Sequence, residues 1–123
     1  MSTIAVLHAG DRPWRSLVDP PGQIPSTGAE ADAFASIDGV FETGFWEREP
    51  DTWSFVRPYH EVALILEGAA EIEADDGTVH TVGPGDVLIT PKGSAGTWRI
   101  TERIVKFYAI ATPPDEMPRN VGA

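Results

Sequence analysis

Short apolar runs separated by turn residues dominate the chain from about residue 40 onwards. Residues 40–48 alternate in the manner of a strand, with Phe41, Thr43, Phe45 and Glu47 on one face and Glu42, Gly44, Trp46 and Arg48 on the other. Further runs of this kind cover residues 53–57, 59–66, 69–74, 87–90, 97–101 and 103–111. Short runs at such regular spacing predict an all-β sandwich or barrel.

The first third of the chain has a different character. Prolines and glycines crowd residues 10–30, where Trp14 is the one bulky apolar anchor. Proline cannot donate a hydrogen bond to a β-ladder, so irregular structure is expected there. We therefore predict an N-terminal arm over residues 1–36, with at most one helical turn near residues 30–36, a barrel over residues 37–112 and a C-terminal tail over residues 113–123.

The dipeptide Asp76-Gly77 is a strong signal for a two-residue hairpin turn. In that register Asp75 faces Thr78 and Glu73 faces His80 across the two strands. A cross-strand pair of Glu73 and His80 on the polar face is an ordinary surface contact.

Composition and charge exclude several kinds of partner. The formal net charge is −10, which repels the phosphate backbone of nucleic acids. The chain has no cysteine, so no disulfide is expected, and no apolar run is long enough to span a membrane. Its N-terminus lacks the pattern of a signal peptide. We expect a cytoplasmic protein that binds neither nucleic acid nor membrane.

Two spaced motifs carry a resemblance to a known family. They are Glu61-x6-Gly68 and Gly85-Asp86-x4-Pro91-x-Gly93, whose glycines and proline suit the corners of a small barrel. Together they resemble the two signature motifs of the cupin superfamily. The resemblance implies an all-β, single-domain cupin jelly-roll β-barrel of the RmlC-like type with an irregular N-terminal arm.

A closer resemblance covers about residues 40–111. The elements that carry it are Trp46-Glu47, the run from Glu61 to Gly68, the Asp76-Gly77 hairpin, the run from Gly85 to Trp98, and Lys106-Phe107-Tyr108. They are similar to the cupin subfamily named for ureidoglycine aminohydrolase, which includes ethanolamine-utilisation cupins. Enzymes of that group that hydrolyse ureidoglycine use a metal held by histidines.

The metal-ligand positions of the cupin motifs are mostly filled by other residues here. The resemblance places the two histidines of the first motif at Phe55 and Arg57, and the histidine and asparagine of the second motif at Gly96 and Ile100. Only Glu61 remains of the usual ligand set, and one carboxylate does not hold a transition metal tightly. We therefore expect no metal and no other cofactor. The alternative is a divalent metal held by Glu61 with His60, which strand alternation turns to the opposite face unless a bulge intervenes.

Strand alternation also predicts a pocket inside the barrel. The side chains expected to share the inward face of Glu61 are Phe55, Arg57, Trp98, Lys106 and Tyr108. We assign Glu61, Lys106 and Tyr108 as candidate catalytic residues and Phe55, Arg57 and Trp98 as the ligand pocket, because apolar walls with a few convergent polar groups are typical of small-ligand sites.

The sequence leaves function open between three readings. The first is a homodimer that binds a small polar or anionic metabolite without a metal, since Arg57 and Lys106 favour an anion. The second is a metal-dependent cupin enzyme of the aminohydrolase or isomerase type, and the third is a binding or regulatory module without catalysis. Lys106 either contacts the ligand or only forms a buried ion pair with Glu61.

Overall fold

A computed structural model describes residues 4–8, 10, 12–17 and 28–113. Every regular element in this part of the chain is a β-strand. The same residues contain no helix that is long and apolar enough to cross a membrane. The strands are β1 (Arg15–Ser16), β2 (Gly28–Ala35), β3 (Phe41–Arg48), β4 (Thr52–Val56), β5 (His60–Ala74), β6 (Val79–Val82), β7 (Val87–Thr90) and β8 (Ala95–Ala111). The chain is an all-β single domain, as the sequence predicts.

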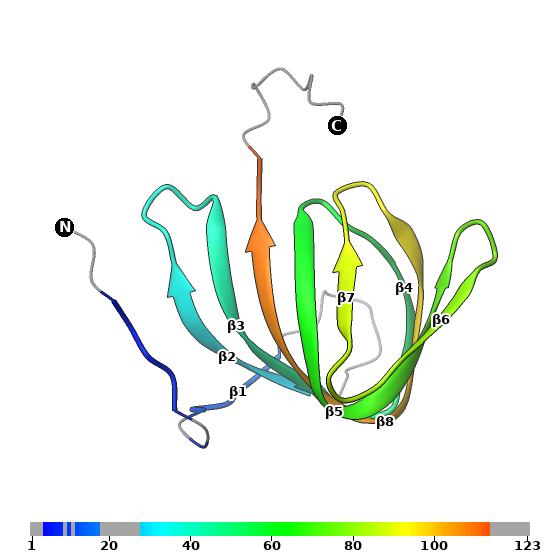
Figure 1. Ribbon diagram of the computed structural model, residues 1–123, viewed down its shortest axis with the longest axis horizontal. Helices are drawn as coiled ribbons and strands as arrows, with labels where there is room; N and C mark the ends of the chain where they lie inside the picture. Colours follow the sequence, from blue (N-terminus) through cyan, green and yellow to red (C-terminus); the bar gives the residue numbers. More distant parts are fainter. Residues whose placement is uncertain (1–3, 9, 11, 18–27, 114–123) are drawn as a thin grey trace.

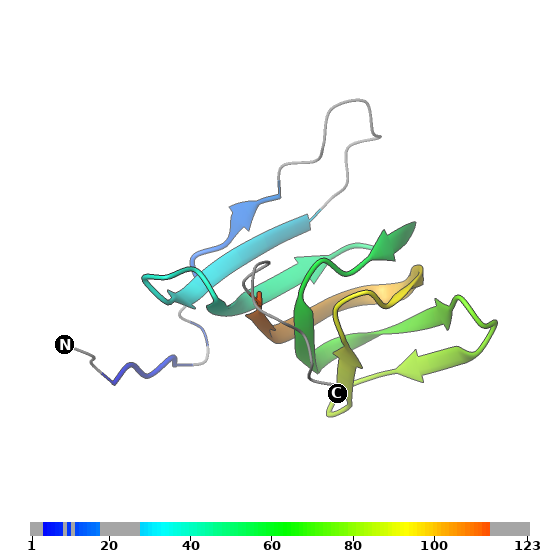
Figure 2. The same cartoon turned by 90° about the horizontal axis from the view of Figure 1, so that it is seen from above.

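Two long strands, β5 and β8, pair along nearly their whole length and form the spine of the barrel (Figures 1 and 2). The first half of β5 also pairs with β7, and its second half pairs with β6. Likewise β8 pairs with β4 near its start and with β3 near its end, and β2 and β1 continue the sheet beyond β3. Each long strand therefore belongs to both halves of an antiparallel jelly roll.

The bend that separates the two halves lies at Gly68. The register between β5 and β8 shifts three times between Ile65 and Ala70, as expected for bulges at a barrel corner. Gly68 has a φ of 88°, and a Cβ at this position would collide with the backbone carbonyl of Arg103. Only glycine fits both conditions, which explains its place in the cupin motif.

The main core lies between the two halves. It contains Ile65, Ala70, Ile72, Val82, Trp98, Ile100 and Ile104, with Trp46, Trp53, Phe55 and Leu88 packed against it. A smaller cluster of Ala63, Tyr108 and Ile110 lies beside Trp46 and Tyr59. The inward face of β8 therefore carries Lys106 and Tyr108, as the alternation predicts.

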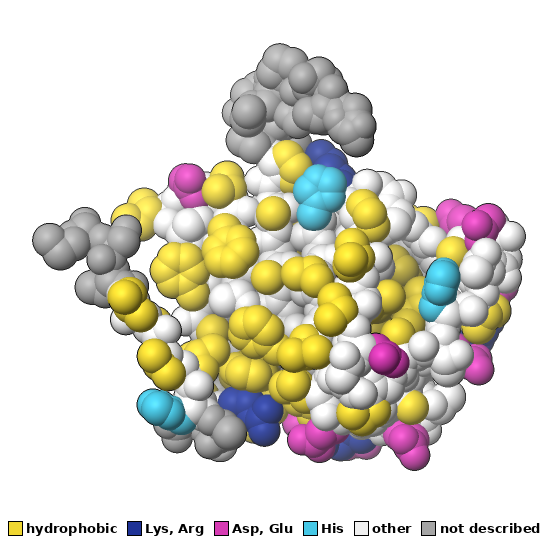
Figure 3. Space-filling model, viewed as in Figure 1, with side chains coloured by type: hydrophobic (Ala, Val, Ile, Leu, Met, Phe, Trp, Pro, Cys, Tyr) yellow, Lys and Arg dark blue, Asp and Glu magenta, His cyan; other side chains and the backbone are white. Residues whose placement is uncertain are grey.

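The outer face of the same sheet is unusually apolar. Phe45, Phe107, Leu64 and Val87 face one another in one row across β3, β8, β5 and β7, and Thr43, Ala109, Val62 and Ile89 form the next row. Val62, Leu64, Val87 and Ile89 are all exposed. Figure 3 shows hydrophobic side chains gathered across this face.

Two predictions of local structure are wrong. Residues 30–36 do not form a helical turn, because β2 covers Gly28–Ala35 and pairs with β3. The hairpin register is also displaced by one residue, so that Glu73 faces Val79 and His80 faces Ile72. A two-residue type I′ turn needs positive φ at both central residues, whereas here only Gly77 adopts it, and the loop consequently has three residues.

The predicted arm is only partly described. Arg12 places its guanidinium 5.6 Å from the ring centre of Trp14 and 5.3 Å from that of Phe45, so this part of the arm contacts the outer face of the sheet. Residues 18–27 of the arm and 114–123 of the predicted tail lie outside the described residues.

Candidate functional site

A cavity of about 270 Å³ opens into the barrel, and most of its lining is charged or aromatic. Its acidic residues are Glu30, Glu42 and Glu61, its basic residues are Arg48, Arg57 and Lys106, and the remainder are Trp46, Trp53, Trp98, Tyr59, Tyr108 and Ile110. Such a concave site with convergent polar groups is the form that small-ligand sites usually take.

Strand register explains why these side chains meet. On the inward face of β3, β8 and β5, three rows cross the sheet: Glu42, Ile110 and Glu61; then Gly44, Tyr108 and Ala63; then Trp46, Lys106 and Ile65. Neighbouring strands lie about 4.8 Å apart, so the backbones of Glu42 and Glu61 are roughly 10 Å from each other. Residues far apart in sequence thus form one continuous wall.

Glu61 and Lys106 form an ion pair inside this wall. The Nζ atom of Lys106 donates a hydrogen bond of 2.7 Å to Oε2 of Glu61, and both side chains are buried. The ammonium also lies 4.7 Å from the ring centre of Trp46 and 5.2 Å from that of Trp98, within range of cation–π attraction. Burial lowers the pKa of Lys106, and the neighbouring Glu61 carboxylate only partly offsets this effect.

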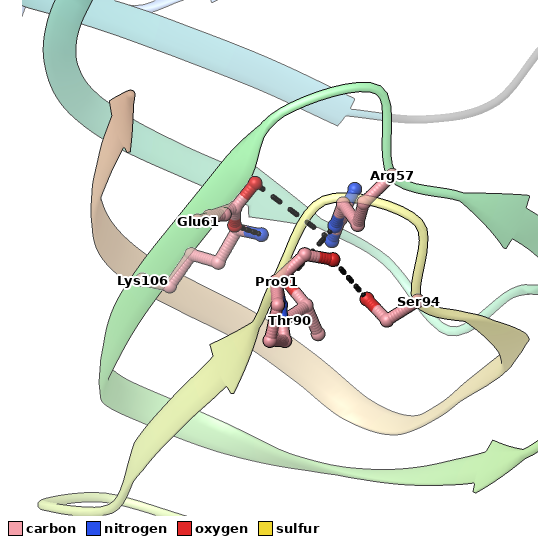
Figure 4. A network of polar contacts seen from close by, with 6 residues as sticks. All are labelled: Arg57, Glu61, Thr90, Pro91, Ser94 and Lys106. Carbon is pink, nitrogen blue, oxygen red and sulfur yellow. Dashed lines mark hydrogen bonds and ion pairs between the residues drawn. The ribbon is translucent and has the colours of Figure 1, made fainter. Parts of the chain in front are cut away.

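Arg57 approaches the same carboxylate from the turn before β5 (Figure 4). Its Nε donates a hydrogen bond of 3.0 Å to Oγ1 of Thr90, and its guanidinium lies 4.7 Å from the ring centre of Phe55. The distance from Nη2 to Oε1 of Glu61 is 3.8 Å, too long for a hydrogen bond. The guanidinium lines the cavity, where the hydroxyl of Tyr59 is a further hydrogen-bond partner, and Arg57 with Lys106 gives two positive charges around one carboxylate.

Both tyrosines of the chain line the cavity. Burial raises the pKa of Tyr108, and the carboxylates of Glu30, Asp32, Glu42 and Glu61 raise it further. Burial and Glu61 likewise raise the pKa of Tyr59. Both hydroxyls therefore stay protonated at neutral pH and can donate hydrogen bonds.

Three tryptophans form the apolar wall of the cavity. The rings of Trp53 and Trp98 are stacked with centres 5.9 Å apart, and Trp46 lies about equally close to both. The guanidinium of Arg48 lies 4.2 Å from the ring centre of Trp53 and forms an ion pair with Asp51. Cations of the protein itself, Arg48 and Lys106, therefore already lie near these tryptophan rings.

Five of the six residues predicted for the pocket line this cavity: Arg57, Glu61, Trp98, Lys106 and Tyr108. Phe55 is the exception. Its ring lines a second cavity of about 540 Å³ beside β6 and β7 and supports Arg57 from behind. Phe55 therefore does not share a cavity with the other five, and the catalytic or binding roles of all six stay predictions.

Sequence reasoning missed seven of the twelve residues that line the cavity. Glu42, Trp46 and Arg48 share the inward face of β3, so the alternation of residues 40–48 contained the signal once that face was known to be inward. Glu30 reaches the cavity only because β2 joins the sheet beside β3. Trp53 and Tyr59 flank Phe55 and Arg57 on the inward-facing positions of the same segment.

The donor set does not fit a cupin metal site. The side chain of His60 is exposed, and its Nδ1 accepts a hydrogen bond of 2.9 Å from the backbone N–H of Lys92 rather than facing Glu61. Gly96 stands at the second-motif histidine position, where even a Cβ would collide with the carbonyl of Glu73. Across residues 28–113 and the described parts of the arm, no three His, Asp or Glu side chains converge on one point. Two cations already face Glu61, which disfavours a third.

Comparisons with known proteins agree with this architecture. A family model described as "EutQ-like cupin domain" matches residues 35–108. The EutQ protein of Clostridium difficile is 19% identical, with a TM-score of 0.62 over 71% of this chain and 69% of that one. A putative ethanolamine utilization protein Q from Salmonella typhimurium is 21% identical, with a TM-score of 0.63 over 72% of each chain.

A DUF861-family protein from Thermotoga maritima is 31% identical, with a TM-score of 0.51 over 52% of this chain and 73% of that one. A search of curated proteins gives no match. The predicted cupin fold and its ethanolamine-utilisation relationship are thus confirmed, while the relationship to ureidoglycine aminohydrolase stays a prediction. Since the family model covers more than half of the chain, this protein belongs to the family of EutQ-like cupin domains.

Proposed function

We propose that this protein binds a small organic anion in the barrel cavity and needs no metal ion to do so. The observation that carries the proposal is that the guanidinium of Arg57 and the ammonium of Lys106 both line the cavity around the single carboxylate of Glu61. Arg57 and Lys106 supply two positive charges and Glu61 supplies one negative charge, so this end of the cavity has a net charge of about +1. A carboxylate matches the planar fork of a guanidinium.

Three features of the site support a binding role. Its volume suits a ligand of a few carbon atoms. The tryptophan wall removes water from one side of the ligand, which strengthens a charged hydrogen bond. Thr90 and the ring of Phe55 hold Arg57 in place, so little side-chain entropy is lost when a ligand binds.

The first test is isothermal titration calorimetry with acetate, propionate, butyrate and small ureido acids. We expect the Arg57→Met variant to bind the best of them about 10-fold or more weakly, because a hydrogen bond to a charged group contributes roughly 1.5–3 kcal/mol. Arg99→Met is the matched control, since Arg99 pairs with Glu73 away from the cavity. Equal binding by wild type and Arg57→Met, or no binding by any of these acids, would contradict the proposal.

Proton-transfer catalysis is the second candidate function, and the buried pair of Lys106 and Glu61 favours it. Burial lowers the pKa of Lys106, which raises the fraction of its neutral amine that is available to accept a proton. Tyr108, one row along the same wall, has a raised pKa and could hold a substrate oxygen by donating a hydrogen bond. An isomerisation or an aminohydrolysis would suit such a set.

This second function has its own readout. A carboxylate that binds is incubated with the protein in heavy water, and the signal of the hydrogen on the carbon next to its carboxylate is followed by NMR. Exchange catalysed by wild type and lost in Lys106→Met supports an enzyme. Binding without exchange supports a module that only binds its ligand.

A further inference from the structure

The cavity also has an acidic end on β2 and β3, across β8 from Glu61. Glu30 on β2 and Glu42 on β3 line it, and Asp32 lies beside them, across from Gly44. Arg15 on β1 contacts Glu30 and Asp32, with nitrogen–oxygen distances of 3.4 and 2.6 Å. Among the described residues Glu42 has no ion pair, so this end keeps a negative charge that the protein itself does not neutralise.

Tyr108 points its hydroxyl toward this acidic end. A Cβ built on Gly44 would lie 3.0 Å from the Tyr108 oxygen, so the phenol lies across Gly44 toward β2. The side chain is only 8% exposed, and its hydroxyl has no hydrogen-bond partner within the part of the chain that the structure describes. The side chain as a whole is buried while its hydroxyl reaches the cavity, so a group bound there can take the hydroxyl as a hydrogen-bond partner.

We propose, building on the anion site above, that the ligand is an organic zwitterion. Its carboxylate binds at Arg57 and Lys106, and its cationic nitrogen binds between Glu30, Glu42 and the Tyr108 hydroxyl. The backbones at the two ends lie about two strand spacings apart, and the inward-pointing side chains shorten the distance between the charged groups. An amino acid with a few carbons between its charges spans this gap.

The tryptophan faces do not compete for the cationic nitrogen. Arg48 already lies on the face of Trp53, and Lys106 lies on Trp46 and Trp98. The carboxylates of β2 and β3 are therefore the groups that a ligand cation reaches. The carboxylates around Tyr108 also raise its pKa, which keeps the phenolic proton in place as a donor to the ligand.

Calorimetry on the full chain with three matched series tests this inference: acetate, propionate and butyrate; glycine, β-alanine and γ-aminobutyrate; and the corresponding alkylamines. We expect one amino acid to bind at least about 10-fold tighter than the carboxylate of equal length. Glu42→Gln should abolish this preference without weakening the binding of the simple carboxylate, because it removes a negative charge from the same cavity. Glu42 is exposed, so this variant folds.

Two further variants make the result specific. Tyr108→Phe, which keeps the ring and removes only the hydroxyl, should reduce the preference for the amino acid. Glu102→Gln, an exposed position away from the cavity, should change nothing. If simple carboxylates bind as tightly as the amino acids, the inference fails and the anion site survives. If no member of any series binds, both fail.

Discussion

The ion pair between Glu61 and Lys106 allows the sharpest test of how the site is built. Lys106→Met keeps the length of the side chain and removes its charge, which leaves a buried carboxylate without its 2.7 Å partner. Breaking a buried pair by removal of one member costs about 3–5 kcal/mol. For a domain of this size each kcal/mol lowers the melting temperature by roughly 4 °C, so a fall of about 12 °C or more is expected.

Glu61→Gln should cost less than Lys106→Met. The ammonium that remains in this variant still lies over Trp46 and Trp98, and desolvated cation–π contacts contribute about 2 kcal/mol. The double variant removes both charges together, so no buried charge is left alone. Its loss of stability should therefore be smaller than the sum of the two single losses by about 2 kcal/mol.

Urea unfolding followed by tryptophan fluorescence measures all four proteins, because the tryptophan cluster lies against the pair. Domains of this kind are stable by about 5–15 kcal/mol, so the single variants should still fold. Additivity within about 0.5 kcal/mol would refute the reasoning, since it would mean that the two groups do not interact in solution. Arg99→Met, which breaks an exposed pair with Glu73, should change stability by less than about 1 kcal/mol.

Three further predictions follow from the same contacts. Burial lowers the pKa of Lys106, so between that lowered pKa and about 10.5 the unfolded chain binds more protons than the folded one. The contribution of Lys106 to the free energy of unfolding should therefore rise with pH in this window. Urea unfolding at two pH values should show that Lys106→Met lacks this rise. Both tyrosines have raised pKa values, so the folded protein should show tyrosinate absorbance only well above pH ~10, whereas the protein unfolded in urea should show it near pH ~10. Titration of the folded protein at the ordinary value would contradict the buried positions of Tyr59 and Tyr108. We also expect a homodimer formed through the apolar outer face, with a mass by light scattering of twice 13.3 kDa. The double variant Val62→Lys with Leu64→Lys should give a monomer, and the control Val79→Lys on β6 should leave the dimer intact. A monomeric wild type would contradict the expectation.

The barrel could be predicted from the sequence because its signals are local. Alternation sets which side chains face inward along β5 and β8, and the glycine at the corner is required by backbone geometry at that one position. These two facts were enough to bring Glu61, Lys106 and Tyr108 to one wall. They did not require knowledge of any other strand.

Two of the misses are consequences of tertiary structure. β2 is rich in alanine, glutamate and aspartate, which are poor strand formers, and it is a strand because β3 offers it a partner. Without β2, Glu30 and the acidic end of the cavity could not be foreseen. Phe55 was misplaced because alternation gives the face of a side chain but not which of two cavities on that face it lines.

The residues at two of the cupin histidine positions, Arg57 and Gly96, change the chemistry of the barrel, and under the proposal above the barrel still attracts anions. A metal ion at this point would supply concentrated positive charge, and here Arg57 and Lys106 supply it around the same Glu61 carboxylate. A guanidinium directs its charge through fixed N–H groups, so it selects a ligand by shape as well as by sign. Glu42, on the other side of Ile110, then adds a charge of the opposite sign across the same cavity. Under the zwitterion proposal, the site recognises the separation between two charges, a property that a single metal ion would not provide.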